Sequence, residues 1–195
     1  CVGYQHNDAF PGSHPLFVGP LGYNGSKAGM QLIADADVVL CLGTRLNPFS
    51  TLPGYGLDYW PKDAKIIQVD INPDRIGLTK KVAVGIIGDA KKVANSILDK
   101  LSATAGDAGR ADRKVKISKT KSQWAQRLSS MDHEDDDPGT SWNERARAAK
   151  PDWMSPRMAW RAIQSALPKD AIISSDIGNN CAIGNAYPTF EKGRK

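Results

Sequence analysis

Three short, largely apolar runs in the first half of the chain constrain its fold more than any other feature. They occupy residues 37–43, 65–71 and 82–87. The first run is continuously apolar from Val38 to Leu42 and ends in Gly, which is typical of a strand buried on both faces of a parallel sheet. Helical patterns lie beside them over residues 27–36 and 90–103. The sequence therefore predicts an α/β fold with a parallel, Rossmann-like sheet flanked by helices.

The pattern changes after this region. Residues 104–121 are rich in Gly, Lys and Arg and lack a sustained apolar period, so a helix is expected only over residues 119–130, around Trp124. We expect residues 1–105 to form a central α/β domain. Residues 106–153 would then form a connecting segment on its surface.

A second unit is expected over residues 154–195. Ser155 followed by Pro156 is typical of a helix start, since Ser caps the helix and Pro needs no N–H partner at the first position. Residues 171–175 form an expected strand. A lone helix and strand cannot bury a core. We therefore expect a truncated second α/β domain, and an internal fragment that opens on Cys1.

The charge is unevenly distributed. Lys and Arg number 26 against 21 Asp and Glu, yet residues 1–109 carry ten of each sign, so the net charge of +5 arises later in the chain. The basic run at residues 110–121 contains no aromatic side chain to stack on a base, and an acidic run follows at 132–137. A solvated connecting segment is favoured over a nucleic-acid-binding patch. No apolar stretch reaches the length of a membrane span.

The cysteines and histidines show no metal-binding or disulfide pattern. Cys1, Cys41 and Cys181 are widely separated, and the three histidines lack the spacing of metal ligands. Cys41 lies within an apolar run and is expected to be a small buried hydrophobe. A reducing, cytoplasmic setting is therefore predicted.

Polar side chains follow each of the three expected strands. In open parallel sheets, ligands bind beyond the carboxyl ends of the strands, where Arg45, Asp70 and Asp89 stand. Arg45 would pair with a phosphate and Asp70 with a ribose hydroxyl in a nucleotide crevice. The alternative, which we favour slightly, is that Asp70 only forms a turn and Asp89 only caps the next helix. No Gly-x-Gly-x-x-Gly follows any strand, which argues against a NAD dehydrogenase.

A second set of candidates follows the expected strand at residues 171–175. Gly178 permits a tight turn, and the amides of Asn179 and Asn180, with nearby backbone N–H groups, would face a diphosphate. The alternative is an ordinary turn, because Gly-Asn pairs are common there. No nucleophile, base and orienting residue can be assigned as a catalytic set.

Several ordered motifs carry a family resemblance. Residues 10–16, 22–25, 36–45 and 65–74 resemble the central domain of thiamine-diphosphate enzymes related to acetolactate synthase. Residues 155–180 resemble the opening of that family's diphosphate-binding domain. The resemblance implies thiamine diphosphate and Mg²⁺ as cofactors of the full-length enzyme. It also implies that the activating glutamate and the metal ligands lie outside this chain, which then holds no catalytic or metal-binding residue.

Two segments narrow the resemblance within the family. Residues 4–8 and 45–61 are most similar to members that convert sulfoacetaldehyde and phosphate into acetyl phosphate and sulfite. This chemistry needs no flavin, so FAD is not predicted, although Arg45, Asp70 and Asp89 match the nucleotide site of some relatives. The family implies a dimer or tetramer, with neither nucleic acid nor membrane as partner. An acetolactate synthase-like carboligase and a non-catalytic nucleotide-binding module remain the alternatives.

Overall fold

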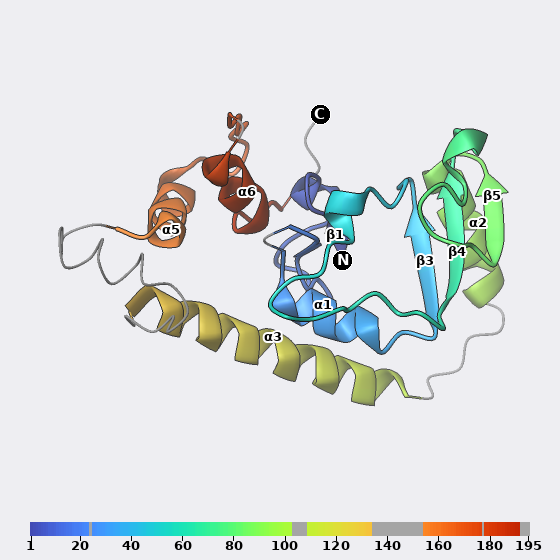
Figure 1. Cartoon of the computed structure of the whole chain (residues 1–195), viewed down its shortest axis with the longest axis horizontal. Helices are drawn as coiled ribbons and strands as arrows, with labels where there is room; N and C mark the ends of the chain where they lie inside the picture. The colour runs from blue at the N-terminus through green and yellow to red at the C-terminus, as the bar shows by residue number, and fades with distance from the viewer. Residues whose placement is uncertain (24, 103–108, 134–153, 177, 192–195) are drawn as a thin grey trace.

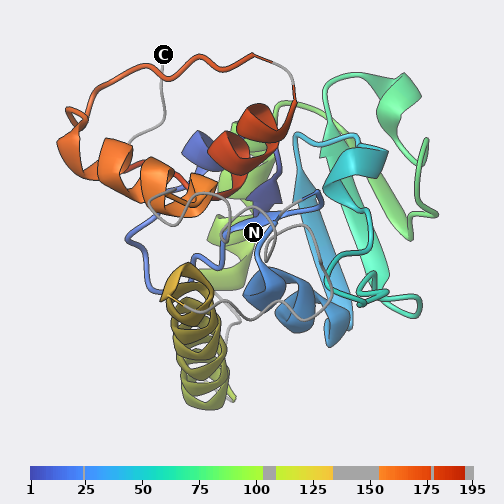
Figure 2. The same ribbon diagram turned by 60° about the vertical axis from the view of Figure 1, so that its left-hand side comes forward.

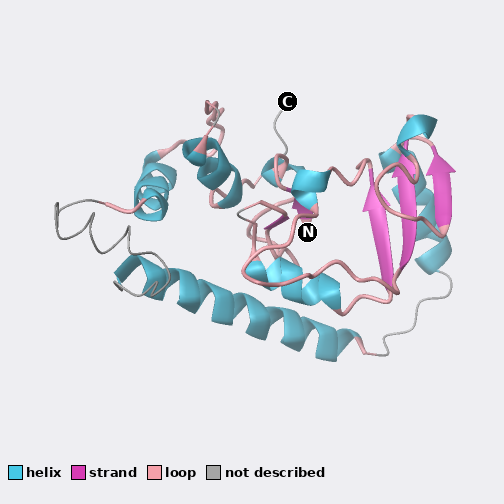
Figure 3. Cartoon of the chain, in the orientation of Figure 1, coloured by secondary structure: helices cyan, strands magenta, loops and turns pink. Residues whose placement is uncertain are grey.

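A computed structural model describes residues 1–23, 25–102, 109–133, 154–176 and 178–191. Figure 1 shows the order of the elements and Figure 3 their type. In chain order they are β1 (Val2–Gly3), η1 (Asn7–Ala9), β2 (Pro20–Leu21), α1 (Lys27–Ala34), β3 (Val38–Leu42), η2 (Pro48–Ser50), β4 (Lys65–Asp70), η3 (Pro73–Arg75), β5 (Val84–Ile87), α2 (Ala90–Ser102), α3 (Arg110–His133), α5 (Pro156–Ala166) and α6 (Asn179–Ala186).

The three apolar runs form one parallel sheet in the order β3-β4-β5, as predicted. In register, Val38 lies opposite Lys65, and Ile67 lies opposite Val84. Figures 1 and 2 show the three strands side by side with α2 against one face. The short strands β1 and β2 pair separately, also in parallel. The predicted α/β architecture is confirmed.

The hydrophobic core consists of two adjoining clusters. One joins Met30 of α1, which is fully buried, to Leu21 and Tyr59. The other joins Cys41 and Ile66 of the sheet to Leu46. Trp60 packs against both clusters. The expectation that Cys41 is a buried hydrophobe is confirmed, since only 5% of it is exposed.

The prediction that the first apolar run is buried on both faces is wrong for β3. Val38, Leu40 and Leu42 are 42–50% exposed, whereas Cys41 between them is buried. Successive strand residues point to opposite faces, so one face of β3 lies in the core and the other is open. Within the sheet, helix α2 packs mainly on β4.

Helix α3 is longer than the sequence predicted. It begins at Arg110, although a helix was expected only over residues 119–130. Its first turns have no continuous apolar stripe, which is the signal that periodicity relies on. Tertiary contacts stabilise it instead. It lies against α1 (Figure 1), its Lys116 pairs with Asp35, and its Trp124 meets the Tyr55 ring edge-on at 5.2 Å.

The C-terminal region contains two helices, α5 and α6, that pack together. The Ser155 hydroxyl accepts from the Met158 N–H at the start of α5, so the predicted cap is confirmed. The predicted strand at residues 171–175 is wrong: this segment forms no regular secondary structure, and Ile172 is 82% exposed. A parallel strand needs a neighbour to supply ladder hydrogen bonds. Among the described residues, no strand pairs with this segment.

The segment that follows α6 returns to the N-terminal loop. The Gly12 N–H donates to the Phe190 carbonyl at 2.7 Å, and Ser13 bonds Glu191 through both its N–H and its hydroxyl. The Asn7 side chain, which is buried, donates to the Asn185 and Pro188 carbonyls. The two ends of the described chain therefore lie together. None of the described helices has the length and apolar character needed to cross a lipid bilayer.

Candidate functional site

The sheet aligns the carboxyl ends of its three strands. The Gly43 N–H, just after β3, donates to the Val69 carbonyl at 2.8 Å. The Gly88 N–H, just after β5, donates to the Asp70 carbonyl at 3.0 Å. The loops that carry Arg45 and Asp89 therefore leave the same edge of the sheet at which Asp70 ends β4, where ligands of open parallel sheets bind.

Each of these three residues also has a local structural contact. Asp70 is 3% exposed, and its Oδ1 accepts from the Asn72 N–H at 2.9 Å. Asp89 Oδ1 accepts from the Lys92 N–H at 2.9 Å and caps α2. Arg45 is exposed, and its carbonyl accepts from the Thr79 hydroxyl. These contacts are the ones expected if Asp70 forms a turn and Asp89 caps a helix.

The residue that organises this edge is Gln68, which the sequence analysis did not single out. It is 1% exposed. Its Nε2 donates to the Thr44 and Arg75 carbonyls at 2.9 and 3.0 Å, and its Oε1 accepts from the Gly77 N–H at 2.8 Å. One side chain thus fixes the loop after β3 to the turn after β4. An amide between the apolar residues Ile67 and Val69 was the available signal, since a buried polar group requires partners.

The loop after β3 holds an uncommon backbone conformation. Leu46 has a φ of 53°, a region that non-glycine residues rarely adopt, and it is buried. Its N–H donates to the Thr44 hydroxyl, and its carbonyl accepts from the Thr79 hydroxyl at 3.0 Å. Strain of this kind persists only where the surroundings over-determine the conformation. The loop beside Arg45 is therefore rigidly positioned.

The second candidate site is the start of α6. Gly178 is its N-cap residue, with a φ of 120° and ψ of −162°, and no atom lies within 4 Å of where a Cβ would stand. Such a backbone is open to glycine alone. The first N–H groups of a helix have no partner within the helix, which suits an anionic ligand. Asn179 and Asn180 form the first turn, but their side chains lie outside the described part of the structure.

Burial keeps several reactive groups near the core in their neutral forms. It raises the pKa of the Cys41 thiol to about 11 and that of the Tyr59 hydroxyl to about 12. It also raises the pKa of Tyr55, whose hydroxyl donates to the Gly25 carbonyl at 2.9 Å. Since the thiolate is the reactive form of cysteine, this raised pKa disfavours nucleophilic chemistry at Cys41. No group of three or more His, Cys, Asp or Glu residues in the described ranges could hold a metal ion.

Comparison with known proteins agrees with this architecture. The family described as "Thiamine pyrophosphate enzyme, central domain" matches residues 1–97. Over its whole length the chain is 84% identical to a sulfoacetaldehyde acetyltransferase of Roseovarius nubinhibens and 77% identical to one of Rhodobacter capsulatus. It covers 32% and 33% of these proteins, so it spans about a third of the relatives' length.

A more distant relative lies in a second enzyme group. An acetolactate synthase large subunit of Corynebacterium glutamicum is 26% identical over 95% of the chain, which covers 26% of that protein. The resemblance expected from the sequence motifs is confirmed, and the parallel sheet of residues 38–87 is the part of the fold that carries it. The chain belongs to the thiamine pyrophosphate enzymes, and residues 1–97 match the central domain of that family.

Proposed function

We propose that this chain is part of a thiamine-diphosphate-dependent acetyltransferase that converts sulfoacetaldehyde and phosphate into acetyl phosphate and sulfite. The observation that carries the proposal is the high identity to two proteins of that name across all 195 residues. That identity extends well past the central domain, into the segment that holds Gly178. The proposed substrates follow from the relatives' name and from the motif resemblance.

The proposed reaction balances without an external oxidant or reductant. The carbon–sulfur bond of sulfoacetaldehyde breaks and releases sulfite. The aldehyde C–H bond also breaks, a proton is added to the methylene carbon, and a bond forms between the carbonyl carbon and a phosphate oxygen. The carbonyl carbon rises to the acyl oxidation level while the methylene carbon becomes a methyl group. Because the two changes cancel, the reaction requires no flavin, and we do not propose FAD as a cofactor.

The start of α6 is the part of this chain that fits the diphosphate end of the cofactor. Gly178 leaves open space before the first turn, and the backbone N–H groups of Asn179 and Asn180 would donate to phosphate oxygens. Mg²⁺ would share those oxygens, as it commonly does with phosphates. When bound, thiamine diphosphate supplies an electron sink for cleavage beside a carbonyl. The catalytic and metal-binding residues would lie outside this chain.

The remaining assignments follow from the same family membership. Residues 1–105 would form the central domain, 106–153 the connection and 154–195 the beginning of the diphosphate-binding domain. Arg45, Asp70 and Asp89 are candidates for a nucleotide crevice in the central domain. We propose that residues 1–195 alone are inactive, and that the full-length protein is a cytoplasmic homo-oligomer, a dimer or a tetramer.

The test is a product assay on the full-length protein. Sulfoacetaldehyde, phosphate, thiamine diphosphate and Mg²⁺ should together yield acetyl phosphate, and omission of any one should abolish it. Acetolactate formed from pyruvate would replace this proposal with the carboligase that the distant acetolactate synthase relative suggests. Micromolar binding of ADP or FAD to residues 1–105, with neither product formed, would favour a nucleotide-binding module.

A further inference from the structure

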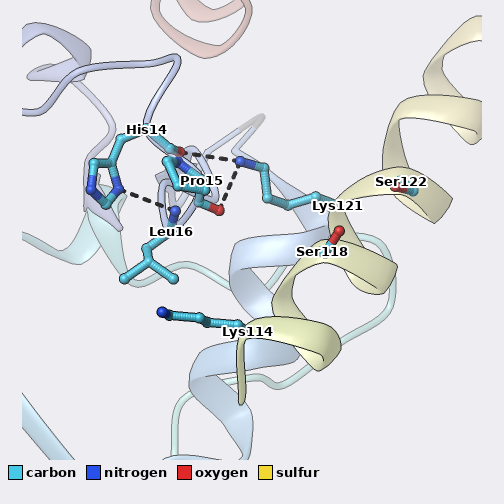
Figure 4. A pocket seen from close by; sticks show the side chains of 7 residues that line it. All are labelled: His14, Pro15, Leu16, Lys114, Ser118, Lys121 and Ser122. Atoms are coloured by element: carbon cyan, nitrogen blue, oxygen red, sulfur yellow. Dashed lines mark hydrogen bonds between the residues drawn. The ribbon is translucent and has the colours of Figure 1, made fainter. Parts of the chain in front are cut away.

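A cavity of about 580 Å³ lies between the loop of residues 14–16 and helix α3 (Figure 4). Four side chains of α3 line it: Lys114, Ser118, Lys121 and Ser122. Relative to Lys114, the other three lie four, seven and eight residues along the chain, which places all four on one face of the helix. Each therefore presents a donor group to the same space.

The charged side chains that line the cavity are both positive. Two lysines line it, and none of the described residues that form its wall is an Asp or Glu. Lys114 is exposed and has no ion pair or hydrogen bond with any described residue. Figure 4 shows its ammonium group and that of Lys121 both directed toward the 14–16 loop. An anion entering the cavity would meet two cations and two hydroxyl donors.

Lys121 is held in place for such a contact. Its Nζ donates to the His14 and Pro15 carbonyls at 3.3 and 3.2 Å. An ammonium group has three N–H donors, so one remains for a ligand. Lys121 is half-buried, which strengthens its interaction with an anion relative to a fully solvated lysine.

The loop opposite α3 is also fixed. His14 Nδ1 accepts from the Leu16 N–H at 3.1 Å, which leaves the proton of the neutral ring on Nε2 as a further donor. The Phe10 ring packs edge-on against His14 at 5.1 Å, and the Phe17 N–H donates to the His14 carbonyl. Pro15 and Leu16 supply an apolar wall beside these donors. The cavity is therefore formed before any ligand arrives.

We propose that this cavity binds the phosphate group of a small organic phosphate, with the apolar part of the ligand against Leu16. Lys114, Lys121, Ser118 and Ser122 would hold the phosphate oxygens. A bare phosphate would leave the apolar wall unused, since the cavity is several times its size. A nucleic acid would contact α3 along its exposed length, but this cluster lies within a concave site. The site is separate from the proposed acetyl transfer and does not depend on it.

The first experiment uses phenyl phosphate, inorganic phosphate and benzyl alcohol in calorimetric titrations of the purified protein. We expect saturable binding of phenyl phosphate, several-fold weaker binding of inorganic phosphate, and none of benzyl alcohol. Equal affinity for the two phosphates would mean that only a bare-anion site exists and would overturn the organic-phosphate assignment. Tighter binding of duplex DNA than of phenyl phosphate would identify α3 as a nucleic-acid surface instead.

The second experiment compares Lys114→Gln with Lys119→Gln. Both remove one exposed positive charge from α3, but Lys119 does not line the cavity. Lys114→Gln should weaken phenyl phosphate binding roughly tenfold, as expected for loss of one charge-assisted contact, and Lys119→Gln should change it less than twofold. If both variants weakened binding equally, binding would depend on the overall positive charge of α3, and the proposal of a local site would be refuted. Circular dichroism checks that both are folded, and Lys114→Glu, which should abolish binding, provides a second variant.

Discussion

The side-chain amide of Gln68 donates to the Thr44 carbonyl across 2.9 Å, from the middle of β4 to the loop after β3. The same amide nitrogen reaches the Arg75 carbonyl, and its oxygen accepts from the Gly77 N–H. The candidate nucleotide edge of the sheet is thus held by one buried side chain.

Replacing this amide should destabilise the protein strongly. Gln68→Leu keeps the volume but leaves two carbonyls and one N–H without their partner, and each buried unsatisfied group costs about 1–3 kcal/mol. We expect a loss of about 3 kcal/mol in the free energy of unfolding, measured by urea denaturation. Gln123→Leu, on the exposed surface of α3, is the control and should change stability by less than about 0.5 kcal/mol. Equal effects would mean that the Gln68 contacts contribute nothing specific.

Asp89 should contribute about 1 kcal/mol to the free energy of unfolding, because it caps α2. Its Oδ1 accepts from the Lys92 N–H, so Asp89→Ala removes the acceptor while Asp89→Asn retains one. The alanine variant should unfold at lower urea and the asparagine variant close to wild type. Asp99→Ala, at the exposed far end of the same helix, should not destabilise. An unchanged Asp89→Ala midpoint would leave ligand binding as the only role for this carboxylate.

Two glycines with positive φ should respond differently to alanine. Gly22 has a φ of 92°, and a Cβ there would lie 2.0 Å from the Phe49 carbonyl oxygen. Gly56 has a φ of 71° with open space around it. Gly56→Ala should cost about 1 kcal/mol from conformation alone. Gly22→Ala should cost several-fold more, read as a lower thermal midpoint. Similar losses at both positions would show that the close approach of Phe49 to Gly22 is not rigid.

Cys41 should make stability fall at alkaline pH. Burial raises the pKa of its thiol from 9.0 to about 11. Between these values the unfolded chain loses the proton and the folded chain keeps it, so deprotonation favours unfolding. The contribution of the neutral thiol is complete below about pH 9 and is lost as the pH rises toward about 11. Urea midpoints measured across this window should fall more steeply for wild type than for Cys41→Ala.

The matched control for this titration is Cys1→Ala, which removes an exposed thiol. Its alkaline profile should follow wild type. If the alkaline fall in the urea midpoint disappeared in Cys1→Ala and persisted in Cys41→Ala, it could not be assigned to the Cys41 thiol. Tyr59 changes stability in the same direction at higher pH, because burial raises its pKa to about 12.

The sheet and its flanking helices could be predicted because their signals are local. The strands β3, β4 and β5 each contain a short apolar run, and the caps at Ser155 and Asp89 follow from side chains next to the helices they start. Helix α3 was underestimated because its early turns are held by partners distant in sequence, such as Asp35 for Lys116. The prediction of a strand at residues 171–175 was wrong because it considered the segment without its neighbours. A strand is stabilised by its neighbours, and a single apolar run does not supply one.

The candidate site also has one part that the sequence predicted and other parts that it did not. The alignment of Arg45, Asp70 and Asp89 at one edge of the sheet follows from parallel strand order, which the sequence indicated. The three-way role of Gln68 depends on the paths of two loops that composition does not describe. The cavity beside His14 requires α3 to cross the 14–16 loop, a contact between residues 107 positions apart in the case of Lys121 and His14.

The pairing of the loop of residues 7–13 with the segment of residues 185–191 has a consequence for the order of folding. The Asn7 and Asn185 contact spans 178 positions, so its loop-closure entropy must be overcome before any stabilisation is gained. Contacts this distant slow the search for the native state, whereas α2 and the neighbouring strands β4 and β5 can form early. In refolding experiments, protection of the Gly12 amide from hydrogen exchange should therefore appear after protection of the Val69 amide. Docking of the segment of residues 185–191 would then be the last step in forming the native state.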